Sequence, residues 1–479
     1  MKVLFAVWEL APFIKVGGLG DIARSLPRAL YSLGVDIRVI IPYYKALKLY
    51  GQKRVKIGSF TVNYAKKIIN ISLFRTTFLY YNIPVYLLDN PTYFDIPKKD
   101  TFAIFDLAVV EIIKKNLISW TPNIVHCNDN HCGLIPLLLK QFKLPIKSLF
   151  TIHNAYYQKK VSLSIVRNIG IDTHKLKILP WEIKNKRVNF LLEGILNADM
   201  VNTVSPSYAK EIYTEEYGAG LDDILRKEGM KIFGILNGID YQIRNPLEDP
   251  YIPYHYTCQD KSSKAIHKDQ VTSYVKGKLL NKKYLQKKLN FKVTDKIPLI
   301  GYIGRFSANQ KGITLIHKML LRLKLNKFQF VLMGSGDEEW EERFTWFSKF
   351  YPNQVFVFNE FKERLASQIY AASDFILIPS KFEPCGLIQM IAMRYGALPI
   401  TRATGGLKDS IKHNVDGFLF NNFSSYDLEN CLRYAIKVKY NQPEKFEKMR
   451  YNAMIKDFSW SSSAQKYIEL YKKLVNTNT

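Results

Sequence analysis

The sequence predicts an α/β protein built from two doubly wound, Rossmann-like domains. Three observations support this prediction: the strand-like runs are continuously apolar, helix-like segments separate them, and the whole pattern restarts in the second half of the chain. Continuous apolar strands are typical of parallel sheets that are buried on both faces. Ligands of such sheets bind at the carboxyl ends of the strands, so a site is expected in the cleft between the two domains.

The expected elements follow one another in the same order in both halves. In the first half, strands are predicted in "VLFAV", "DIRVIIP", "IPVYLLD", "NIVHC" and "SLFTIH", and helices in "IARSLPRALYSLG" and "FAIFDLAVVEIIKKNL". In the second half, strands are predicted in "IPLIGYIGRF", "FQFVLMGSG", "VFVF", "FILIPS" and "ALPIT", with helices between them. The proline- and aromatic-rich stretch 245–257 is expected to link the domains, and an amphipathic helix is expected from Trp460 onward.

Length and composition are those of a globular protein with two large cores, since the chain has 479 residues and is 47% hydrophobic. No apolar run approaches the roughly 18 residues that would span a bilayer, and Glu9 interrupts the apolar N-terminus. We therefore expect a cytoplasmic protein with no membrane partner. The five cysteines are few and scattered, which favours reduced thiols over a disulfide framework.

The chain is strongly basic, with 69 Lys and Arg against 42 Asp and Glu and a formal charge of +27. Such an excess raises the hypothesis of a nucleic-acid partner. The lysines are spread along the chain, however, and the richest stretch, "KGKLLNKKYLQKKLNFK", has leucines at helical spacing, which predicts a solvated helix face. We therefore expect no nucleic-acid partner, whereas a small negatively charged substrate fits the charge.

A glycine-rich loop, "KVGGLGD", lies between the first strand and the first helix. The backbone N–H groups of Gly17 and Gly18 at a helix start can meet an anion, and Lys15 adds a positive charge. The loop lacks both the G-x-G-x-x-G spacing and the G-K-[ST] ending, so neither a dinucleotide nor a P-loop fingerprint is present. A tight turn with an exposed lysine is the structural alternative.

Polar residues follow two further strands of the first half. The segment "IVHCNDNHCGL" contains Asp129 with two His and two Cys, which suggests zinc, but no second cluster is apparent to complete a tetrahedral site. We therefore expect a strand end that delivers polar groups to the cleft, and no metal. His153 and Asn154 follow the next strand in the same way, although a lone histidine is also common in a purely structural role.

Two cations follow the first strand of the second half. Arg305 and Lys311 lie in "GRFSANQKG", a segment without an acidic residue. Their countercharge must then come from an anion or from solvent. A solvated loop is the alternative interpretation.

A carboxylate and two glycine loops follow later strands. Glu383 follows the strand "FILIPS", and the N–H groups of Gly386 and Leu387 open the next helix, where an anion could bind. Gly405 and Gly406, in "TRATGGLKDS", repeat this arrangement after the following strand.

Eight segments then resemble a known family: "KVGGLGD", "FTIHN", "TVSPSYAKEI", "GILNGID", "NQKG", "FEPCGLIQM", "RYGALPITRATGGL" and "DFSW", in this order across nearly the whole chain. The family is that of bacterial glycogen synthases and plant starch synthases, retaining glucosyltransferases of the two-Rossmann-domain GT-B architecture. The resemblance implies transfer of glucose from ADP-glucose, with UDP-glucose as the alternative donor, to the non-reducing end of an α-1,4-glucan, without metal or other cofactor. It also implies an N-terminal acceptor-side domain (1–244), a nucleotide-sugar domain (245–460) and a C-terminal helix (461–479) that packs back on the first domain.

The resemblance assigns expected roles by position. Arg305 and Lys311 match the pair that binds the donor diphosphate and stabilises its departure, Glu383 the carboxylate near the sugar, and His153 the histidine beside the reacting sugar. Lys15, Gly17 and Gly18 match the loop that meets the diphosphate when the cleft closes. The other substrate-binding positions that it implies are Asp129, Asn237, Gly386, Leu387, Gly405 and Gly406.

Alternatives stay open for the reaction mechanism and for the class of protein. The resemblance implies a front-face route in which the leaving phosphate helps to deprotonate the acceptor hydroxyl, whereas retention would ordinarily suggest double displacement. Asn130, Ile388 and Phe361 depart from residues that are common in the family. Ile391 stands where a related glycosyltransferase family carries a second glutamate. A non-catalytic glucan-binding protein is the alternative of a different class.

Overall fold

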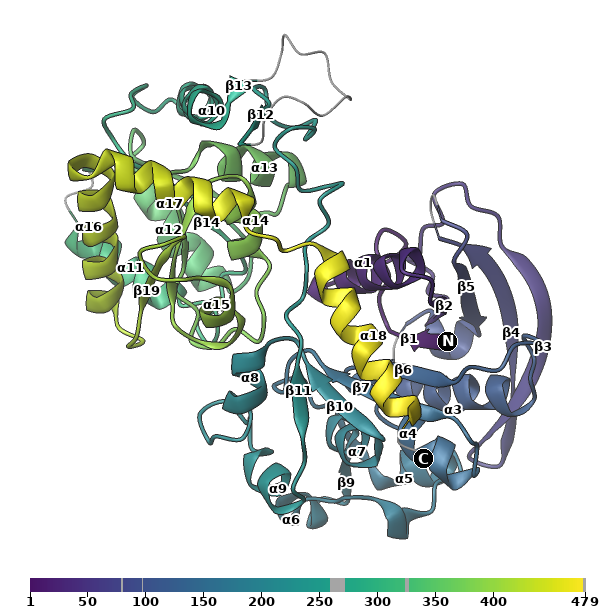
Figure 1. The fold of residues 1–479 in the computed structure, drawn as a ribbon. Helices are drawn as coiled ribbons and strands as arrows, with labels where there is room; N and C mark the ends of the chain where they lie inside the picture. Colours follow the sequence, from purple (N-terminus) through teal and green to yellow (C-terminus); the bar gives the residue numbers. More distant parts are fainter. Residues whose placement is uncertain (79–80, 97, 259–271, 324–326, 477–479) are drawn as a thin grey trace. The chain divides into compact units, whose positions relative to one another are not determined.

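The computed structural model of the protein describes residues 1–78, 81–96, 98–258, 272–323 and 327–476. The chain packs as two units (Figure 1): unit 1 comprises Met1–Asn237 and Trp460–Thr479, and unit 2 comprises Gly238–Ser459. These bounds lie a few residues from those expected. The stretch 245–257, expected as a link, belongs to unit 2, where the Tyr256 hydroxyl donates to the Tyr395 carbonyl at 2.8 Å. Within this stretch Tyr256 is buried, whereas Tyr251 and Tyr254 are exposed.

The sheet of unit 1 has the strand order β11-β10-β7-β6-β1-β2-β5-β4-β3. Its strands are β1 (Lys2–Ala6), β2 (Asp36–Pro42), β3 (Val55–Tyr64), β4 (Lys67–Thr77), β5 (Pro84–Asp89), β6 (Ile124–Asn128), β7 (Lys147–Ile152), β10 (Met200–Thr203) and β11 (Ile232–Gly234). The pairing is parallel except where β4 pairs with β3 and β5. The hairpin of β3 and β4 is not among the elements expected from the sequence, because β3 is largely exposed and has no continuous apolar run.

Helices cover this sheet, and the last helix of the chain is one of them. The helices are α1 (Gly18–Ser32), α2 (Pro91–Phe94), α3 (Thr101–Lys114), α4 (Ile135–Gln141), α5 (Leu163–Asn168), α6 (Pro180–Ile183), α7 (Phe190–Asn197), α8 (Pro206–Glu211), α9 (Asp222–Lys227) and α18 (Trp460–Asn476), with 3₁₀ turns η1 (Asn130–Cys132) and η2 (Thr173–Lys175) and a small hairpin of β8 (Lys160–Ser162) and β9 (Arg187–Asn189). Figure 1 shows α18 beside α1, although the two are far apart in sequence.

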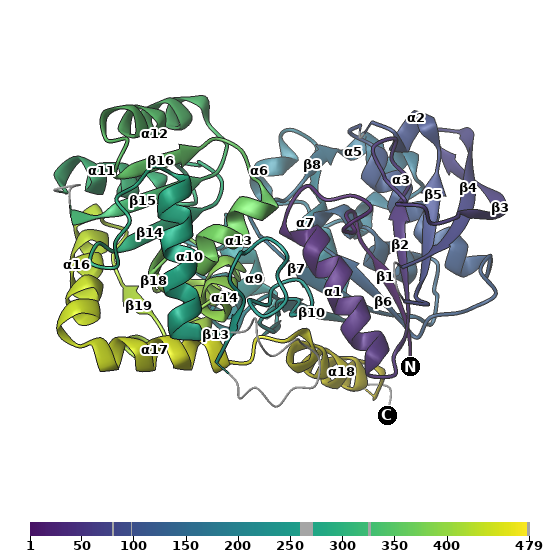
Figure 2. The same ribbon diagram turned by 90° about the horizontal axis from the view of Figure 1, so that it is seen from above.

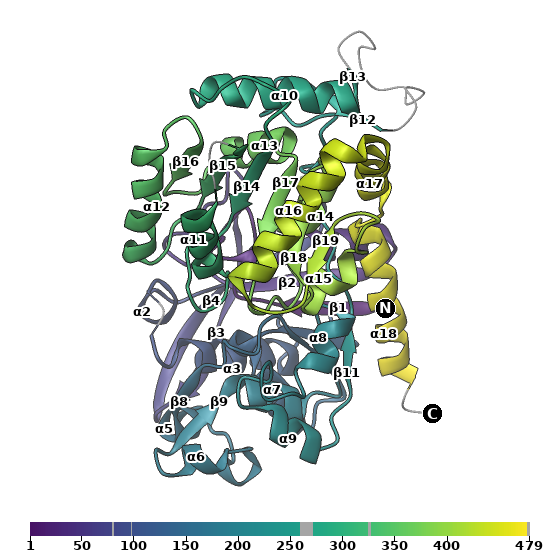
Figure 3. The ribbon, with the colours of Figure 1, turned by 90° about the vertical axis from the view of Figure 1, so that its left-hand side faces the viewer.

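The sheet of unit 2 is parallel, with the order β16-β15-β14-β17-β18-β19. Its strands are β14 (Leu299–Ile303), β15 (Gln329–Met333), β16 (Val355–Phe358), β17 (Phe375–Ile378), β18 (Leu398–Arg402) and β19 (Phe418–Phe420), and the short strands β12 (Tyr256–Thr257) and β13 (Thr272–Ser273) form a separate pair. The helices are α10 (Tyr274–Lys288), α11 (Ile313–Arg322), α12 (Glu338–Phe350), α13 (Glu363–Ala372), α14 (Ile388–Arg394), α15 (Gly405–Ser410), α16 (Ser425–Asn441) and α17 (Pro443–Ile455). Figure 3 shows α11 and α16 side by side.

Helix α10 differs from the solvated face that its lysines predict. Figure 2 shows it along unit 2 beside α13, and Lys278 and Lys282 are buried. The Lys282 ammonium pairs with Asp374 at 2.8 Å, and the Lys278 ammonium donates to two backbone carbonyls. Burial lowers the pKa of both lysines, despite the attraction of Asp374. Part of the positive charge of the chain is therefore internal to the fold.

Two further findings concern the described part of the chain. None of its helices combines the length and the apolar character needed to cross a membrane. All five cysteines have free thiols, and four of them are buried.

Candidate active site

Three neighbouring strands of unit 2 carry the predicted residues of the second half at their carboxyl ends. Strand β14 pairs with β17, and β17 pairs with β18. Arg305 and Lys311 follow β14, Glu383 follows β17, and the glycine pair that opens α15 follows β18. The parallel order of this sheet thus gathers the three segments at one edge.

Lys311 and Glu383 form an ion pair, although 72 residues separate them in sequence. The Lys311 Nζ lies 2.7 Å from the Glu383 Oε2, and both side chains are largely buried. The same carboxylate oxygen accepts a hydrogen bond from the Ser380 hydroxyl at 2.9 Å. The structure corrects the expectation that the lysine lacks an acidic partner, because Glu383 supplies the countercharge from another loop.

A glycine holds the cationic loop against the end of β17. Gly312 has a φ of +65°, and a Cβ added there would lie 1.9 Å from the Pro379 carbonyl oxygen. Only glycine fits this close approach at this dihedral. The approach places Lys311 beside Glu383, while the Arg305 guanidinium donates to the Gln310 side chain at 3.2 Å.

The loops that follow β17 and β18 are also in close contact. The Gly406 N–H donates to the Glu383 carbonyl at 3.1 Å, and a Cβ added to Gly406 would lie 2.2 Å from the Cys385 carbonyl oxygen. Gly386 has a φ of +73°, and Leu387 precedes α14 as its N-cap. These glycines therefore have a structural requirement of their own, which is the packing of one loop on the other.

In unit 1, the ends of β6 and β7 bring Asp129 and His153 together. The His153 Nε2 lies 3.0 Å from the Asn128 Oδ1. The nearby backbone N–H groups of Asn130, His153 and Asn154 act to lower the pKa of the Asp129 carboxyl. Burial raises the pKa of Asp129 to about 8, with a smaller contribution from Glu9. Burial lowers the pKa of His153 to about 3, helped by His131. At neutral pH the histidine is uncharged and most of the aspartate is protonated.

Asp129 and His153 each have one side-chain atom without a partner in the described chain. The Asp129 Oδ1 and the His153 Nδ1 are buried and have no hydrogen-bond partner among the described residues. Asp129 also has a φ of 62°, a sparsely populated conformation for a non-glycine residue. Buried polar atoms without partners are uncommon in folded proteins and call for an explanation such as a ligand.

Glu9 anchors the glycine-rich loop that follows β1. Its Oε2 accepts hydrogen bonds from the backbone N–H groups of Val16 and Gly17, each at 2.8 Å. The loop side chain Lys15 pairs with Asp21 at 2.7 Å, and both are about 40% exposed. The position of the loop thus depends on a buried carboxylate that the sequence shows only as an interruption of the apolar N-terminus.

Gly17 and Gly18 have no structural requirement for glycine. Neither has a positive φ, and a Cβ added to either would have no described atom within 4 Å. Both are exposed at the start of α1. Their lack of side chains leaves the backbone open to a close approach from outside.

The histidine rings of "IVHCNDNHCGL" have partners within the fold. The His126 ring bonds to Tyr471 and Thr151, while the His131 ring stacks on Trp8 at 5.6 Å. Among the described residues, no group of three His, Cys, Asp or Glu is arranged to hold a metal ion. These side chains pack in the core of unit 1 and around Asp129.

Three further positions from the sequence analysis differ in their surroundings. Asn237, at the end of the first segment of unit 1, is buried, and its Oδ1 has no partner in the described chain. Asn130 donates to the Tyr157 carbonyl at 2.7 Å, so it has a structural role of its own. Phe361 is 54% exposed.

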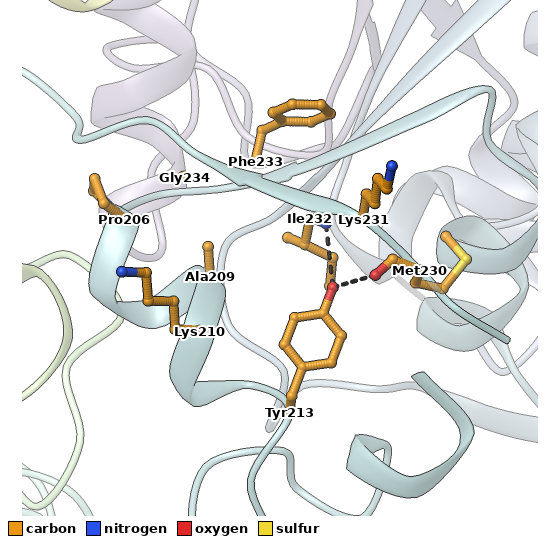
Figure 4. Close-up of a pocket in the computed structure, with 9 residues that line it drawn as sticks. All are labelled: Pro206, Ala209, Lys210, Tyr213, Met230, Lys231, Ile232, Phe233 and Gly234. Atoms are coloured by element: carbon orange, nitrogen blue, oxygen red, sulfur yellow. Dashed lines mark hydrogen bonds between the residues drawn. The ribbon is translucent and has the colours of Figure 1, made fainter. Parts of the chain in front are cut away.

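A separate hollow of about 630 Å³ lies between α8 and the edge strand β11 (Figure 4). Tyr213 is one of the lining residues, and its hydroxyl donates to the Met230 carbonyl and accepts from the Ile232 N–H. None of the predicted site residues lines this hollow. We therefore assign it no part in the candidate site.

The structure thus assembles two groups, one in each unit. In unit 2 it brings together Arg305, Lys311, Glu383 and the glycine loops, and it adds Ser380 and Gln310. In unit 1 it brings together Asp129 and His153, and it adds Glu9, Trp8 and His131. The added polar residues also follow strands, which is the one signal in the sequence that could have identified them.

Comparison with known proteins finds similarity over the whole chain. Residues 2–227 match the family model described as starch synthase catalytic domain, and residues 282–454 match that described as glycosyl transferases group 1. The glycogen synthase of Streptococcus equi subsp. equi is 37% identical over 496 residues, which cover 99% of this chain and 100% of the relative. That of Streptococcus sanguinis is 38% identical over 498 residues, with the same coverage.

Solved structures are similar to this chain over nearly its whole length. The catalytic domain of starch synthase IV from Arabidopsis thaliana, bound to ADP and acarbose, is 31% identical with a TM-score of 0.86, and the match covers 99% of each chain. Sucrose-phosphate synthase from Thermosynechococcus elongatus, at 17% identity and a TM-score of 0.61 over 99% of each chain, is alike in fold alone.

Proposed function

The chain belongs to the glycogen synthase and starch synthase family, has the GT-B fold and transfers glucosyl units to a glucan; we propose that its donor is ADP-glucose and that it extends the non-reducing end of an α-1,4-glucan with retention of configuration. ADP bound to the related starch synthase supports this donor. UDP-glucose is the alternative. The cytoplasmic location and the absence of membrane and nucleic-acid partners stay predictions.

The observation that carries the proposal is the Lys311–Glu383 pair at the ends of β14 and β17. Cleavage of a sugar–diphosphate bond places negative charge on the leaving group, and preorganised cations stabilise that charge. Lys311 is fixed at 2.7 Å from Glu383, and Arg305 lies on the same loop. We assign these two cations to the donor diphosphate, with the backbone of Gly386, Leu387, Gly405 and Gly406 beside it; the Gly406 N–H itself donates to the Glu383 carbonyl.

Glu383 is suited to orient groups rather than to attack the sugar. Its Oε2 accepts from both Lys311 and Ser380, so two donors hold the carboxylate in place. In the proposed front-face reaction, the acceptor hydroxyl oxygen bonds to the anomeric carbon as the bond to the diphosphate breaks. The leaving phosphate oxygen takes the proton of that hydroxyl, and Glu383 steadies Lys311 and the positive charge that develops on the sugar.

Unit 1 supplies hydrogen bonds for sugar hydroxyls in this proposal. The Asp129 Oδ1 and the His153 Nδ1 are buried without a described partner, and a glucosyl unit carries the hydroxyls that would satisfy them. A carboxyl group with a pKa of about 8 is largely protonated at pH 7, so it can donate as well as accept. Lys15 and the Gly18 N–H are assigned to the diphosphate, together with Gly17, whose own N–H donates to Glu9 in this structure; Asn237 is assigned to the substrate.

The proposal is tested by the fate of labelled glucose. Purified protein is incubated with glycogen and either ADP-[¹⁴C]glucose or UDP-[¹⁴C]glucose, and the polymer is then digested with an α-1,4-specific glucosidase. We expect incorporation chiefly from ADP-glucose, full release of the label by the glucosidase, and the same rate in excess chelator. Label that enters only from UDP-glucose, or that resists digestion, would contradict the donor or the linkage.

A further inference from the structure

Helix α12 in unit 2 carries aromatic side chains on two faces. Phe344 and Phe347 are buried and contact His317 of α11. On the other side, Trp346 is 42% exposed and Phe350 is 64% exposed. The inward aromatic residues explain how the helix is held, but packing within unit 2 does not require the outward ones.

The outward residues form one continuous patch with the residue that follows the helix. The Trp346 and Phe350 ring centroids are 4.4 Å apart with an interplanar angle of 31°. Tyr351, which is 38% exposed, lies 6.4 Å from Trp346. Figure 3 shows α12 at the outer side of unit 2, beside β16. We call Trp346, Phe350 and Tyr351 the α12 aromatic patch.

From this patch we propose a second binding site for the α-1,4-glucan, separate from the residues assigned to the reaction. Apolar surface of this size on a protein is often functional. The flat faces of pyranose rings present C–H groups, and aromatic faces, which carry partial negative charge, attract such groups. The proposal rests on the proposed function, because the family reaction acts on a glucan.

The size of the patch favours a sugar chain over a second copy of the protein. Each of the three side chains exposes between about a third and two thirds of its surface. Since an aromatic side chain has roughly 150–250 Å² to bury, the patch amounts to about 300 Å². A stable protein interface needs about 800 Å² from each partner. A few stacked glucose units need far less.

The charges beside the patch balance one another, which favours neither an acidic nor a basic partner. Arg343 pairs with Glu339 at 2.7 Å, and the exposed Glu342 and Lys349 carry opposite charges. Membrane-surface helices instead carry Lys and Arg on the polar side, and nucleic acids require cations. An uncharged polymer meets no repulsion here, and the exposed Glu342 and Lys349 can hydrogen-bond to its hydroxyls.

The consequence is retention of a long acceptor between rounds of transfer. A glucan that is bound at the patch raises the effective concentration of its own chain ends near the protein. A short oligosaccharide cannot gain from this tethering. Long and short acceptors should therefore respond differently when the patch is removed.

The test uses the double variant Trp346→Ala/Phe350→Ala, with Tyr426→Ala as the matched control. Tyr426 is 65% exposed on α16 of the same unit and lies outside the patch. Affinity is measured by electrophoresis through gels with and without glycogen, and rates are measured with glycogen and with maltotriose at saturating ADP-glucose. Thermal melting checks the fold of each variant.

We expect the double variant to bind glycogen roughly tenfold more weakly, the order of loss found when aromatic stacking on a flexible polymer is removed. Its KM for glycogen should rise while its kcat and its KM for maltotriose stay at the wild-type values. Unchanged migration in glycogen gels would overturn the proposal. A lower assembled mass of the double variant in sedimentation would overturn it too, since the patch would then be a protein interface. Gel migration does not depend on catalysis, so failure of the proposed reaction remains distinguishable.

Discussion

Single residues differ in whether the fold or a ligand requires them, and the glycines show this most clearly. Gly312 and Gly406 are constrained by neighbouring carbonyl groups, whereas Gly17 and Gly18 face open space. A glycine that the chain does not need for its own packing costs conformational entropy without a return in stability. The assignment of Gly18 to the donor accounts for that cost.

Gly18→Ala is expected to separate the two requirements. Alanine has room and is a better helix former at the start of α1, so the melting temperature should stay the same or rise slightly. Turnover of ADP-glucose should fall by roughly tenfold or more, because the methyl group blocks an approach to the backbone N–H groups and weakens one preorganised contact. Gly58→Ala on β3, where an added Cβ also meets open space, is the control and should leave turnover unchanged. Full activity of Gly18→Ala would show that the donor does not contact the backbone at this position.

Asp129 is expected to lower the stability of the fold in a way that depends on pH. Its pKa is about 8 in the folded chain, above the ordinary value of 3.8, so the folded state binds the proton more tightly than the unfolded state. The free energy of unfolding therefore falls as pH rises from about 4 to about 8. Asp129→Asn removes this penalty. It should raise the melting temperature more at pH 9 than at pH 5, while it lowers glucosyl transfer.

Calorimetry at the two pH values checks this prediction, with exposed Asp223→Asn on α9 as the control. The buried histidines of unit 1 act in the opposite sense, because their lowered pKa values make stability fall as pH drops below about 6.5. This contribution of the histidines is expected to be the same in Asp129→Asn and in Asp223→Asn. An equal gain in melting temperature at both pH values would show that Asp129 is ionised and satisfied in the fold.

At the scale of elements, α18 is held to unit 1 by buried polar contacts as well as by apolar ones. The Tyr471 hydroxyl lies 2.7 Å from the His126 Nδ1, and the Asn202 amide donates to the Tyr467 hydroxyl at 3.1 Å. His126 also contacts Thr151 at 2.6 Å, and Thr151 donates to Asn202. The network therefore ties the last helix to strands β6, β7 and β10.

Tyr471→Phe should loosen this helix. The substitution leaves the buried His126 Nδ1 without a partner, which typically costs about 1–3 kcal/mol. Amide hydrogen exchange in α18 should speed up, whereas exchange in α16 should not change. Tyr434→Phe, at a partly exposed position in unit 2, is the control. Exchange in α18 at the wild-type rate would show that apolar packing alone holds the helix.

The sequence predicts elements well where apolar runs are continuous and poorly where they are not. The parallel strands of both sheets follow from runs such as "VLFAV" and "FILIPS", and the GT-B architecture is confirmed by the structural relatives. The exposed hairpin of β3 and β4 escaped prediction because it lacks such a run. The burial of Lys278 and Lys282 was not predicted, because their hydrogen-bond partners come from distant parts of the chain.

The same limit applies to the candidate site. Position after a strand was enough to single out Lys311 and Glu383, but not to show that they pair across 72 residues. Position after a strand was the only signal from Glu9, because its partners are backbone N–H groups that any sequence possesses. The assigned roles themselves rest on the family resemblance and stay predictions.

At the scale of the whole molecule, the proposed function assigns residues of each unit to the donor diphosphate. Lys311 lies in unit 2 and Lys15 in unit 1. If Lys311 holds the donor before and during reaction, its loss weakens both binding and turnover. If Lys15 acts on the diphosphate chiefly in the transition state, its loss lowers turnover more than binding.

The most direct test of this claim is therefore one paired measurement. ADP affinity is measured by calorimetry, and turnover is measured with glycogen at saturating ADP-glucose. The proteins compared are wild type, Lys15→Ala, Lys311→Ala and the control Lys318→Ala, at an exposed position. We expect Lys311→Ala to lose both, with turnover down by roughly a hundredfold, or about 3 kcal/mol in the barrier. Lys15→Ala should keep most of its ADP affinity but lose turnover, and Lys318→Ala should match wild type. Near-normal turnover of a well-folded Lys311→Ala, or a Lys15→Ala that loses affinity yet keeps its turnover, would contradict the account.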